Sequence, residues 1–138
     1  MADFDIDTRE LDLFSEELED LQRLFPKESR KLMQRSGNKA RSVVVDKAKQ
    51  IVKKKTGNYL KSIKRGKVWV SEDGTKVRVY SAAPHAHLIE KGHRIVDKDG
   101  TEHGFVAGVH VFDKAEREIE SQWGTILEQE FNRIMSKL

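Results

Sequence analysis

Cysteine is absent from this chain of 138 residues, and proline occurs only twice. The absence of cysteine excludes disulfide bonds and thiolate zinc sites, and it is compatible with an intracellular protein. Scarce proline together with 36% charged residues favours a helix-rich, well-solvated domain. No run approaches the roughly eighteen apolar residues that would predict a membrane-spanning helix. The acidic N-terminus also lacks the basic and apolar segments of a secretory signal.

Sequence signatures of catalysis are missing as well. The segments RSGNKA and HGFVAG contain glycine but lack the spacing and context of a phosphate-binding loop. No serine lies in a nucleophile-elbow motif. We therefore expect a single domain over residues 1–138 that has no catalytic residues, no metal and no cofactor.

The net charge of +3 conceals two oppositely charged blocks. Residues 1–20, the acidic block, contain nine acidic side chains and one arginine, a net of −8. Residues 27–67, the basic block, contain fifteen lysines and arginines and two acidic side chains, a net of +13. These blocks could bind each other, a neighbouring subunit or nucleic acid, or they could be the solvated faces of long helices.

Three stretches carry apolar residues at the three- and four-residue steps of an amphipathic helix. The first predicts an acidic helix at about 8–25, and Pro26 interrupts the pattern after it. The second predicts a basic helix at about 27–54, with its lysines and arginines facing outward. The third predicts a C-terminal helix at about 114–137.

The segments between these helices read as a small sheet. KVWVS and TKVRVYS alternate polar and apolar residues about the turn sequence EDGT, which predicts a β-hairpin at about 67–81. Residues at about 93–108 hold three glycines and no periodic face, so we expect a flexible loop, followed by a short strand in VHVFD. The expected fold is α+β, with long N-terminal helices and a C-terminal helix packed on a small antiparallel β-sheet.

The segment APHAHLIEKGHRI places His85, His87, Glu90 and His93 within nine residues, which suggests a metal site. On a helix, however, ligands three residues apart drift off a single face, and the zinc-protease arrangement of two histidines four residues apart is absent. We therefore interpret the histidines as surface or interface groups, with Glu90 accepting a hydrogen bond from one of them.

Two motifs follow one another along the chain, TGNYLKSI at 56–63 and HAHLIEKGH at 85–93. The first is similar to Thr-Gly-x-Leu-x-x-Ser-Ile but has one extra residue before the leucine, where Asn58-Tyr59 stands. The second is similar to aromatic-Ala-x-x-hydrophobic-Glu-x-Gly. In this order and after a basic helix, they resemble the tail-completion proteins of long-tailed phages and prophages. The resemblance extends over about 40–138, although Asp113-Lys114-Ala115 replaces the proline pattern at the family's last helix start. The matching residues are Thr56, Gly57, Leu60, Ser62, Ile63, Ala86, Ile89, Glu90 and Gly92.

The resemblance implies a non-catalytic structural protein that acts in tail completion or head–tail joining and assembles into a ring. Its partners would be copies of itself and other phage neck or tail proteins, without a membrane. It would reside in the virion, and in the bacterial host cytoplasm during assembly.

The same resemblance assigns structural roles to the motif residues. Thr56 and Gly57 would end the long helix, and Glu90 would cap a helix or pair with a base. Gly92 would adopt a backbone conformation closed to other residues.

A ring built by head-to-tail contacts could join the acidic block of one subunit to the basic block of the next. Lys53, Lys54 and Lys55 are candidate residues for this charged interface, and the loop at about 93–108 could order on contact with neighbours.

The alternative function is nucleic-acid binding by the basic helix, which would be weak and salt-sensitive because it relies on phosphate contacts. Tyr59 and Trp69 could then stack on bases. The modest overall charge and the lack of a nucleic-acid motif argue against it. A metal-dependent hydrolase is a third alternative that depends on the histidines alone.

Overall fold

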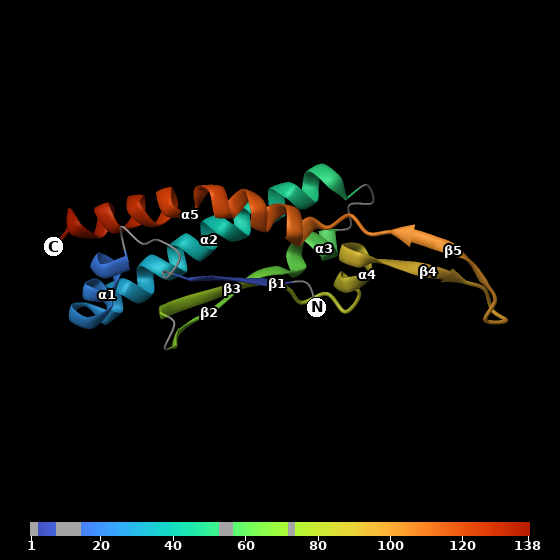
Figure 1. Ribbon diagram of the computed structural model, residues 1–138, viewed down its shortest axis with the longest axis horizontal. Helices are drawn as coiled ribbons and strands as arrows, with labels where there is room; N and C mark the ends of the chain where they lie inside the picture. The colour runs from blue at the N-terminus through green and yellow to red at the C-terminus, as the bar shows by residue number, and fades with distance from the viewer. Residues whose placement is uncertain (1–2, 8–14, 53–56, 72–73) are drawn as a thin grey trace.

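The computed structural model describes residues 3–7, 15–52, 57–71 and 74–138 (Figure 1). It confirms the α+β fold class, with helices packed on a small antiparallel sheet. In chain order the elements are β1 (Asp3–Asp7), α1 (Ser15–Leu24), α2 (Pro26–Ile51), α3 (Gly57–Ser62), β2 (Ile63–Ser71), β3 (Gly74–Ser81), α4 (Ala86–Lys91), β4 (Gly92–Val96), β5 (Glu102–Ala107) and α5 (Val111–Met135).

The main sheet has three antiparallel strands in the order β1-β3-β2. Alternation along β3 buries Val77 and Val79, and Phe4 of β1 pairs with Val79 on the same buried face. The long helix α2 packs on β2 and β3 and also on α5, which it crosses diagonally in Figure 1, and α5 in turn contacts β1. The core therefore forms between one sheet face and two long helices.

A proline marks the start of the long helix α2. Pro26 occupies its first turn, where a missing N–H costs nothing. Its apolar stripe, predicted from the helical spacing, is buried at Leu32, Met33, Ala40, Val44 and Ala48. The helix ends at Ile51, three residues before the expected end, and Val52 is its C-cap. Residues 53–56 lie outside the described residues.

The hairpin expected at about 67–81 is formed by β2 and β3, although β2 already begins at Ile63. The strand β1 was not expected, since we had assigned its region only to the acidic block. Of the acidic helix expected at about 8–25, the structure describes the part from residue 15 onward, where α1 runs to Leu24.

Two predictions for the C-terminal half are wrong. Residues 93–108 are not an irregular loop, because β4 and β5 pair there as a second antiparallel hairpin. VHVFD is not a strand, because α5 starts at Val111 and residues 111–113 form its first turn. Helical spacing continues backward into this segment, since Val111, Phe112 and Ala115 all point into the core. Among the described residues, no helix combines the length and apolar character needed to cross a membrane.

Candidate functional site

The second motif forms a corner between α4 and α5, and Glu90 is at its centre. The Glu90 side chain is buried, at 4% exposure. Its two carboxylate oxygens accept hydrogen bonds from the backbone N–H groups of Phe112 (2.8 Å) and Asp113 (3.0 Å). These N–H groups belong to the first turn of α5 and have no partner within the helix, and the helix dipole favours a negative charge there. Glu90 is therefore the N-terminal cap of α5, supplied by a different helix.

Backbone hydrogen bonds reinforce the same corner. The carbonyl oxygens of Ile89 and Glu90 accept from the N–H groups of Val109 (2.9 Å) and His110 (3.1 Å). His110 itself has a left-handed backbone, with φ 52° and ψ 49°, immediately before the helix. Such a conformation is unfavourable for a non-glycine residue, so surrounding contacts must hold it in place.

Two glycines let the backbones at this corner touch. Gly92 has a φ of +90°, and a Cβ atom there would lie 2.3 Å from the carbonyl oxygen of Val106. A Cβ atom at Gly108 would lie 2.3 Å from the carbonyl oxygen of Glu90. The positive φ of Gly92 agrees with the role expected of it. The sequence did not indicate that Gly108 must also be glycine, because the atoms that its Cβ would meet are distant in sequence.

The first motif closes a neighbouring junction. The Ser62 hydroxyl donates to the carbonyl of Tyr59 and is 2.7 Å from the hydroxyl of Ser81 at the end of β3. The carbonyl of Ser62 accepts from the N–H of Ala82 at 2.8 Å. Ile63 is fully buried. These contacts fix the path from α3 into the sheet and onward to α4.

Tyr59 connects the two motifs electrostatically. Burial and, to a smaller extent, the charge of the Glu90 carboxylate together raise the pKa of Tyr59 to about 12. The motif residues Ser62 and Glu90 therefore contribute to adjacent parts of one structural corner. Of the remaining motif positions, Ala86 is buried, and Leu60 and Ile89 are half-buried.

The expected roles of Thr56 and Gly57 have different outcomes. Thr56 lies outside the described residues. Gly57 does not end the long helix, because α2 has already ended at Ile51 and Gly57 is the first residue of α3. Within the described parts of the chain, and apart from its own chain neighbours and helix backbone, no atom lies within 4 Å of a Cβ built at Gly57, so packing against these parts does not require glycine there.

The histidines of the second motif do not converge. His85 precedes α4 without a side-chain cap, while His87 and His93 are exposed. Glu90 accepts backbone N–H groups rather than an imidazole N–H, so the expected hydrogen bond to one of these histidines is wrong. The corner uses the carboxylate as a cap and leaves the imidazoles at the surface.

Among the described residues, one group of possible metal ligands meets, and it comprises Glu90, His110 and Asp113. His110 Nδ1 lies 3.2 Å from Asp113 Oδ2 at the exposed start of α5. Each Glu90 oxygen already accepts a backbone N–H, so a cation would compete with the cap of α5. The geometry is thus explained by capping without a metal.

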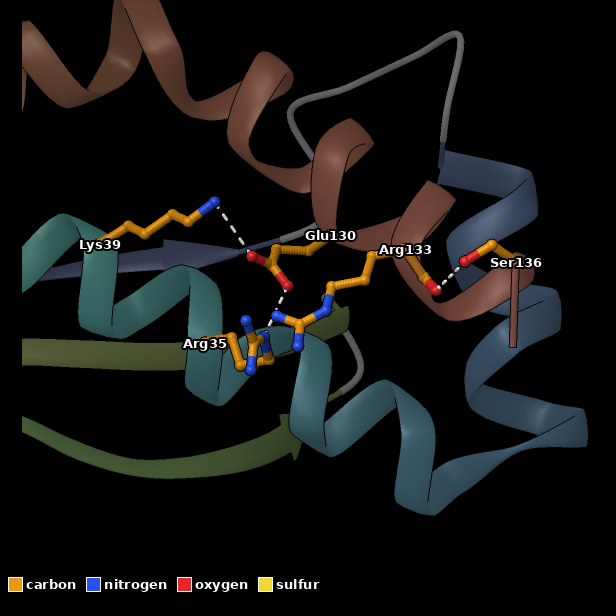
Figure 2. Close-up of polar contacts among 5 residues, drawn as sticks. All are labelled: Arg35, Lys39, Glu130, Arg133 and Ser136. Carbon is orange, nitrogen blue, oxygen red and sulfur yellow. Dashed lines mark hydrogen bonds and ion pairs between the residues drawn. The ribbon is translucent and has the colours of Figure 1, made fainter. Parts of the chain in front are cut away.

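A second buried carboxylate, Glu130, lies between α5 and α2 (Figure 2). Glu130 Oε2 accepts from Arg35 Nε at 2.8 Å, and its Oε1 lies 3.0 Å from Lys39 Nζ. Burial raises the pKa of Glu130, but the two hydrogen-bonded cations outweigh burial and lower it below its ordinary value. Arg133 extends toward the same group in Figure 2, so positive charge exceeds negative charge here.

Other ion pairs show how the charged blocks are used. Asp5 of the acidic block binds Arg78 of β3, with oxygen–nitrogen distances of 2.7 and 3.3 Å. Lys47 of the basic block binds Glu118 of α5 at 2.9 Å. Within the part of the chain that the structure describes, no ion pair joins the acidic block to the basic block. Lys53, Lys54 and Lys55 lie outside that part.

The two aromatic residues proposed to stack on bases are not both available. Tyr59 is buried, at 4% exposure, so it cannot stack on a base in this fold. Trp69 is half-buried, and the Arg78 guanidinium lies 5.5 Å from the centroid of its ring. The structure therefore weakens the stacking argument for nucleic-acid binding.

Comparison with known proteins adds a family match. A family model described as "Bacteriophage HK97-gp10, putative tail-component" matches residues 12–92. This range contains the whole first motif, including Ser62, and the second motif as far as Gly92, including Glu90. No curated protein and no solved structure matches the chain.

Proposed function

Because the chain belongs to the HK97-gp10-like family of phage tail components, we propose that it completes the tail or joins it to the head as a ring of identical copies. A tail component has a structural role and a place in the virion. Its partners under this proposal are further copies of itself and other neck or tail proteins, which it meets in the host cytoplasm during assembly. Under this proposal the protein acts by binding its neighbours through complementary surfaces and catalyses no reaction.

The main support for the proposal is that the polar side chains of the two motifs are engaged in hydrogen bonds within the protein. Glu90 is buried and holds two backbone N–H groups of α5, and Ser62 binds the ends of α3 and β3. A catalytic carboxylate or hydroxyl would need to face a substrate. These groups instead stabilise a corner, which supports a structural role for the motifs that define the match.

The arrangement of charge supports contacts between copies. The exposed acids of α1 have no described ion pair to the basic block, so they can meet the basic surface of a neighbour. The groove between α2 and α5, with a volume of about 390 Å³, has more basic than acidic side chains in its lining, which includes Lys31, Arg35, Arg133 and Lys137 beside Glu28 and Glu130. A heterologous contact of this kind, repeated by rotation, generates a ring.

Inactivating the gene in a phage or prophage that produces particles tests the tail role. We expect electron microscopy to show heads without tails or tails with an unfinished end, and a plasmid copy of the gene to restore complete particles. Normal particle yield without the protein would contradict the proposal. The mass of the complex extracted from complete particles tests the ring, which predicts a whole-number multiple of one chain.

A charge-reversal variant tests the surface mechanism separately. Changing Lys53, Lys54 and Lys55 to glutamate should impair completion more than folding, because the change reverses three charges of the basic block and alters no described core residue. Circular dichroism reports folding and the particle yield reports completion. A variant that folds and completes particles at the normal yield would remove these lysines from the interface and leave the tail role intact.

A further inference from the structure

The hairpin of β4 and β5, here called the arm, extends away from the body at one end of the molecule (Figure 1). Every residue from His93 to Ala107 is exposed, although four of them are large and apolar. Phe105 is 61% exposed and Val96 is 53% exposed. An isolated two-stranded hairpin is marginally stable in water, so a second surface covering these side chains would stabilise it.

One face of the arm combines apolar and positive character. Arg94 pairs with Phe105 across the two strands, so their side chains share a face. Val96, two residues beyond Arg94 on β4, lies on the same face, and its cross-strand partner beyond a β-bulge is Glu102, so the positive charge of this face is confined to Arg94. Arg94 has no ion-pair partner among the described residues.

The tip of the arm is organised before any contact is made. Asp97 Oδ1 accepts from the N–H groups of Asp99 and Thr101 at 2.9 Å each. Asp97 Oδ2 lies 2.6 Å from His103 Nε2 on the other strand. An arm with its tip held in this way loses less conformational entropy on binding than an irregular loop would.

A groove of complementary character lies at the opposite end of the molecule, between α1 and α5 (Figure 1). Its volume is about 180 Å³, and Leu24 on its edge is 60% exposed. Glu17 and Asp20 add negative charge to this groove, and Glu17 has no ion-pair partner in the described parts of the chain. The apolar lining consists of Leu21, Leu24, Phe25, Phe131 and Met135.

We propose that the arm of one copy docks in the α1–α5 groove of the next copy, with Phe105 on the apolar lining and Arg94 beside Glu17. The surfaces match in chemistry, since each offers exposed apolar side chains next to an unpaired charge of opposite sign. They lie at opposite ends of the long axis, so the contact is head-to-tail and can repeat from copy to copy. The inference rests on the proposed function, because it names the contact that would link the copies.

Cysteine cross-linking tests this contact, because the natural chain has no cysteine. A chain carrying both Val96→Cys on the arm and Met135→Cys in the groove is incorporated into particles and oxidised. We expect a ladder of dimers, trimers and larger species on a non-reducing gel, because each contact joins one arm to one groove. Either substitution alone should give no ladder.

Matched controls separate docking from random collision and from misfolding. Val96→Cys combined with Glu120→Cys, on an exposed part of α5, should give no ladder. Adding Phe105→Ser to the cross-linking pair should reduce the ladder by at least about tenfold, as the loss of a buried aromatic anchor does. Circular dichroism should remain unchanged, because Phe105 is exposed in the single chain.

Particle assays distinguish the failure of this inference from the failure of the proposed function. If particles contain the wild-type chain but the cross-linking pair gives no ladder, docking of the arm in the groove is wrong and the tail role stands. The same conclusion follows if Phe105→Ser and Leu24→Ser chains each complete particles at the normal yield. If removal of the wild-type chain leaves particle yield unchanged, the proposed function itself fails.

Discussion

Replacing Glu90 by glutamine should destabilise the protein strongly, although the two side chains have nearly the same shape. The carboxylate is buried and accepts two backbone N–H groups of α5. Glutamine keeps one acceptor oxygen and presents an NH₂ group to the other N–H, so one hydrogen bond is lost and both lose their charge assistance.

The magnitude follows from these contacts. A hydrogen bond to a charged group contributes about 1.5–3 kcal/mol, and a charge near a helix end contributes ~0.3–2 kcal/mol according to its burial. We expect Glu90→Gln to cost about 2–3 kcal/mol. Glu90→Ala, which removes both acceptors and leaves a void, should cost about 3–5 kcal/mol.

Urea unfolding monitored by circular dichroism measures this cost. The midpoint should fall while the slope of the unfolding free energy against urea stays constant, because the surface exposed on unfolding is unchanged. In a domain of this size, the melting temperature should fall by roughly 3–4 °C for each kcal/mol. Glu120→Gln, on an exposed part of α5, is the matched control and should lie within about 0.5 kcal/mol of wild type.

A particular result would refute the reasoning. If Glu90→Gln were as stable as the Glu120→Gln control, the two hydrogen bonds at the start of α5 would not stabilise the corner. Glu90 would then need another explanation, and the structural interpretation of the second motif would lose its main support.

Four further predictions concern other parts of the molecule. Glu130→Gln should cost about 1–2 kcal/mol at neutral pH, because its two cation partners are partly exposed and can be solvated. The pKa of Glu130 is lowered in the folded state. The stability that Glu130 contributes is therefore fully present above its ordinary pKa of 4.5 and is lost as pH falls through the folded pKa. Urea midpoints measured from pH 7 to pH 3 should show the stabilities of wild type and Glu130→Gln converging. Gly92→Ala should lower the unfolding free energy by more than about 2 kcal/mol, because of the positive φ and the contact with the Val106 carbonyl. Gly57→Ala should be neutral or stabilising. Thermal melting of both variants decides whether the corner needs its glycine. Duplex DNA should bind weakly at low salt and dissociate near physiological salt in gel shifts, and submicromolar binding that survives physiological salt would favour the nucleic-acid alternative. Elemental analysis after purification without chelators should find no stoichiometric transition metal. One equivalent of zinc that disappears in His110→Ala would show that Glu90, His110 and Asp113 bind a metal.

Periodicity in the sequence was enough to predict the long elements. The apolar stripes of α2 and α5 repeat at helical spacing, and the segments around EDGT alternate as strands do. These patterns are local consequences of burying one face, so they can be recognised without knowledge of the partner surface. The segment DFDID of β1 also alternates as a strand does, but its density of acidic residues is equally typical of an exposed charged segment.

Such patterns do not predict the position and length of the second hairpin. Neither strand of the arm buries a face against the body, so no alternation of burial marks them. Their pairing depends on the turn at Asp97 and on the close approach of Gly92 and Gly108, whose neighbours are distant in sequence. A three-glycine segment without a periodic face consequently resembled a loop.

By itself, the sequence determined the fold class, the long helices and the motifs of the tail-component family. Only the tertiary structure decided what the motif residues contact. Glu90 meets α5 across 22 residues of chain, and Arg35 meets Glu130 across 95. Local spacing determines which face of an element is buried, but the partner of a buried charge depends on how whole elements pack, because burial is favourable only where a complementary group is present.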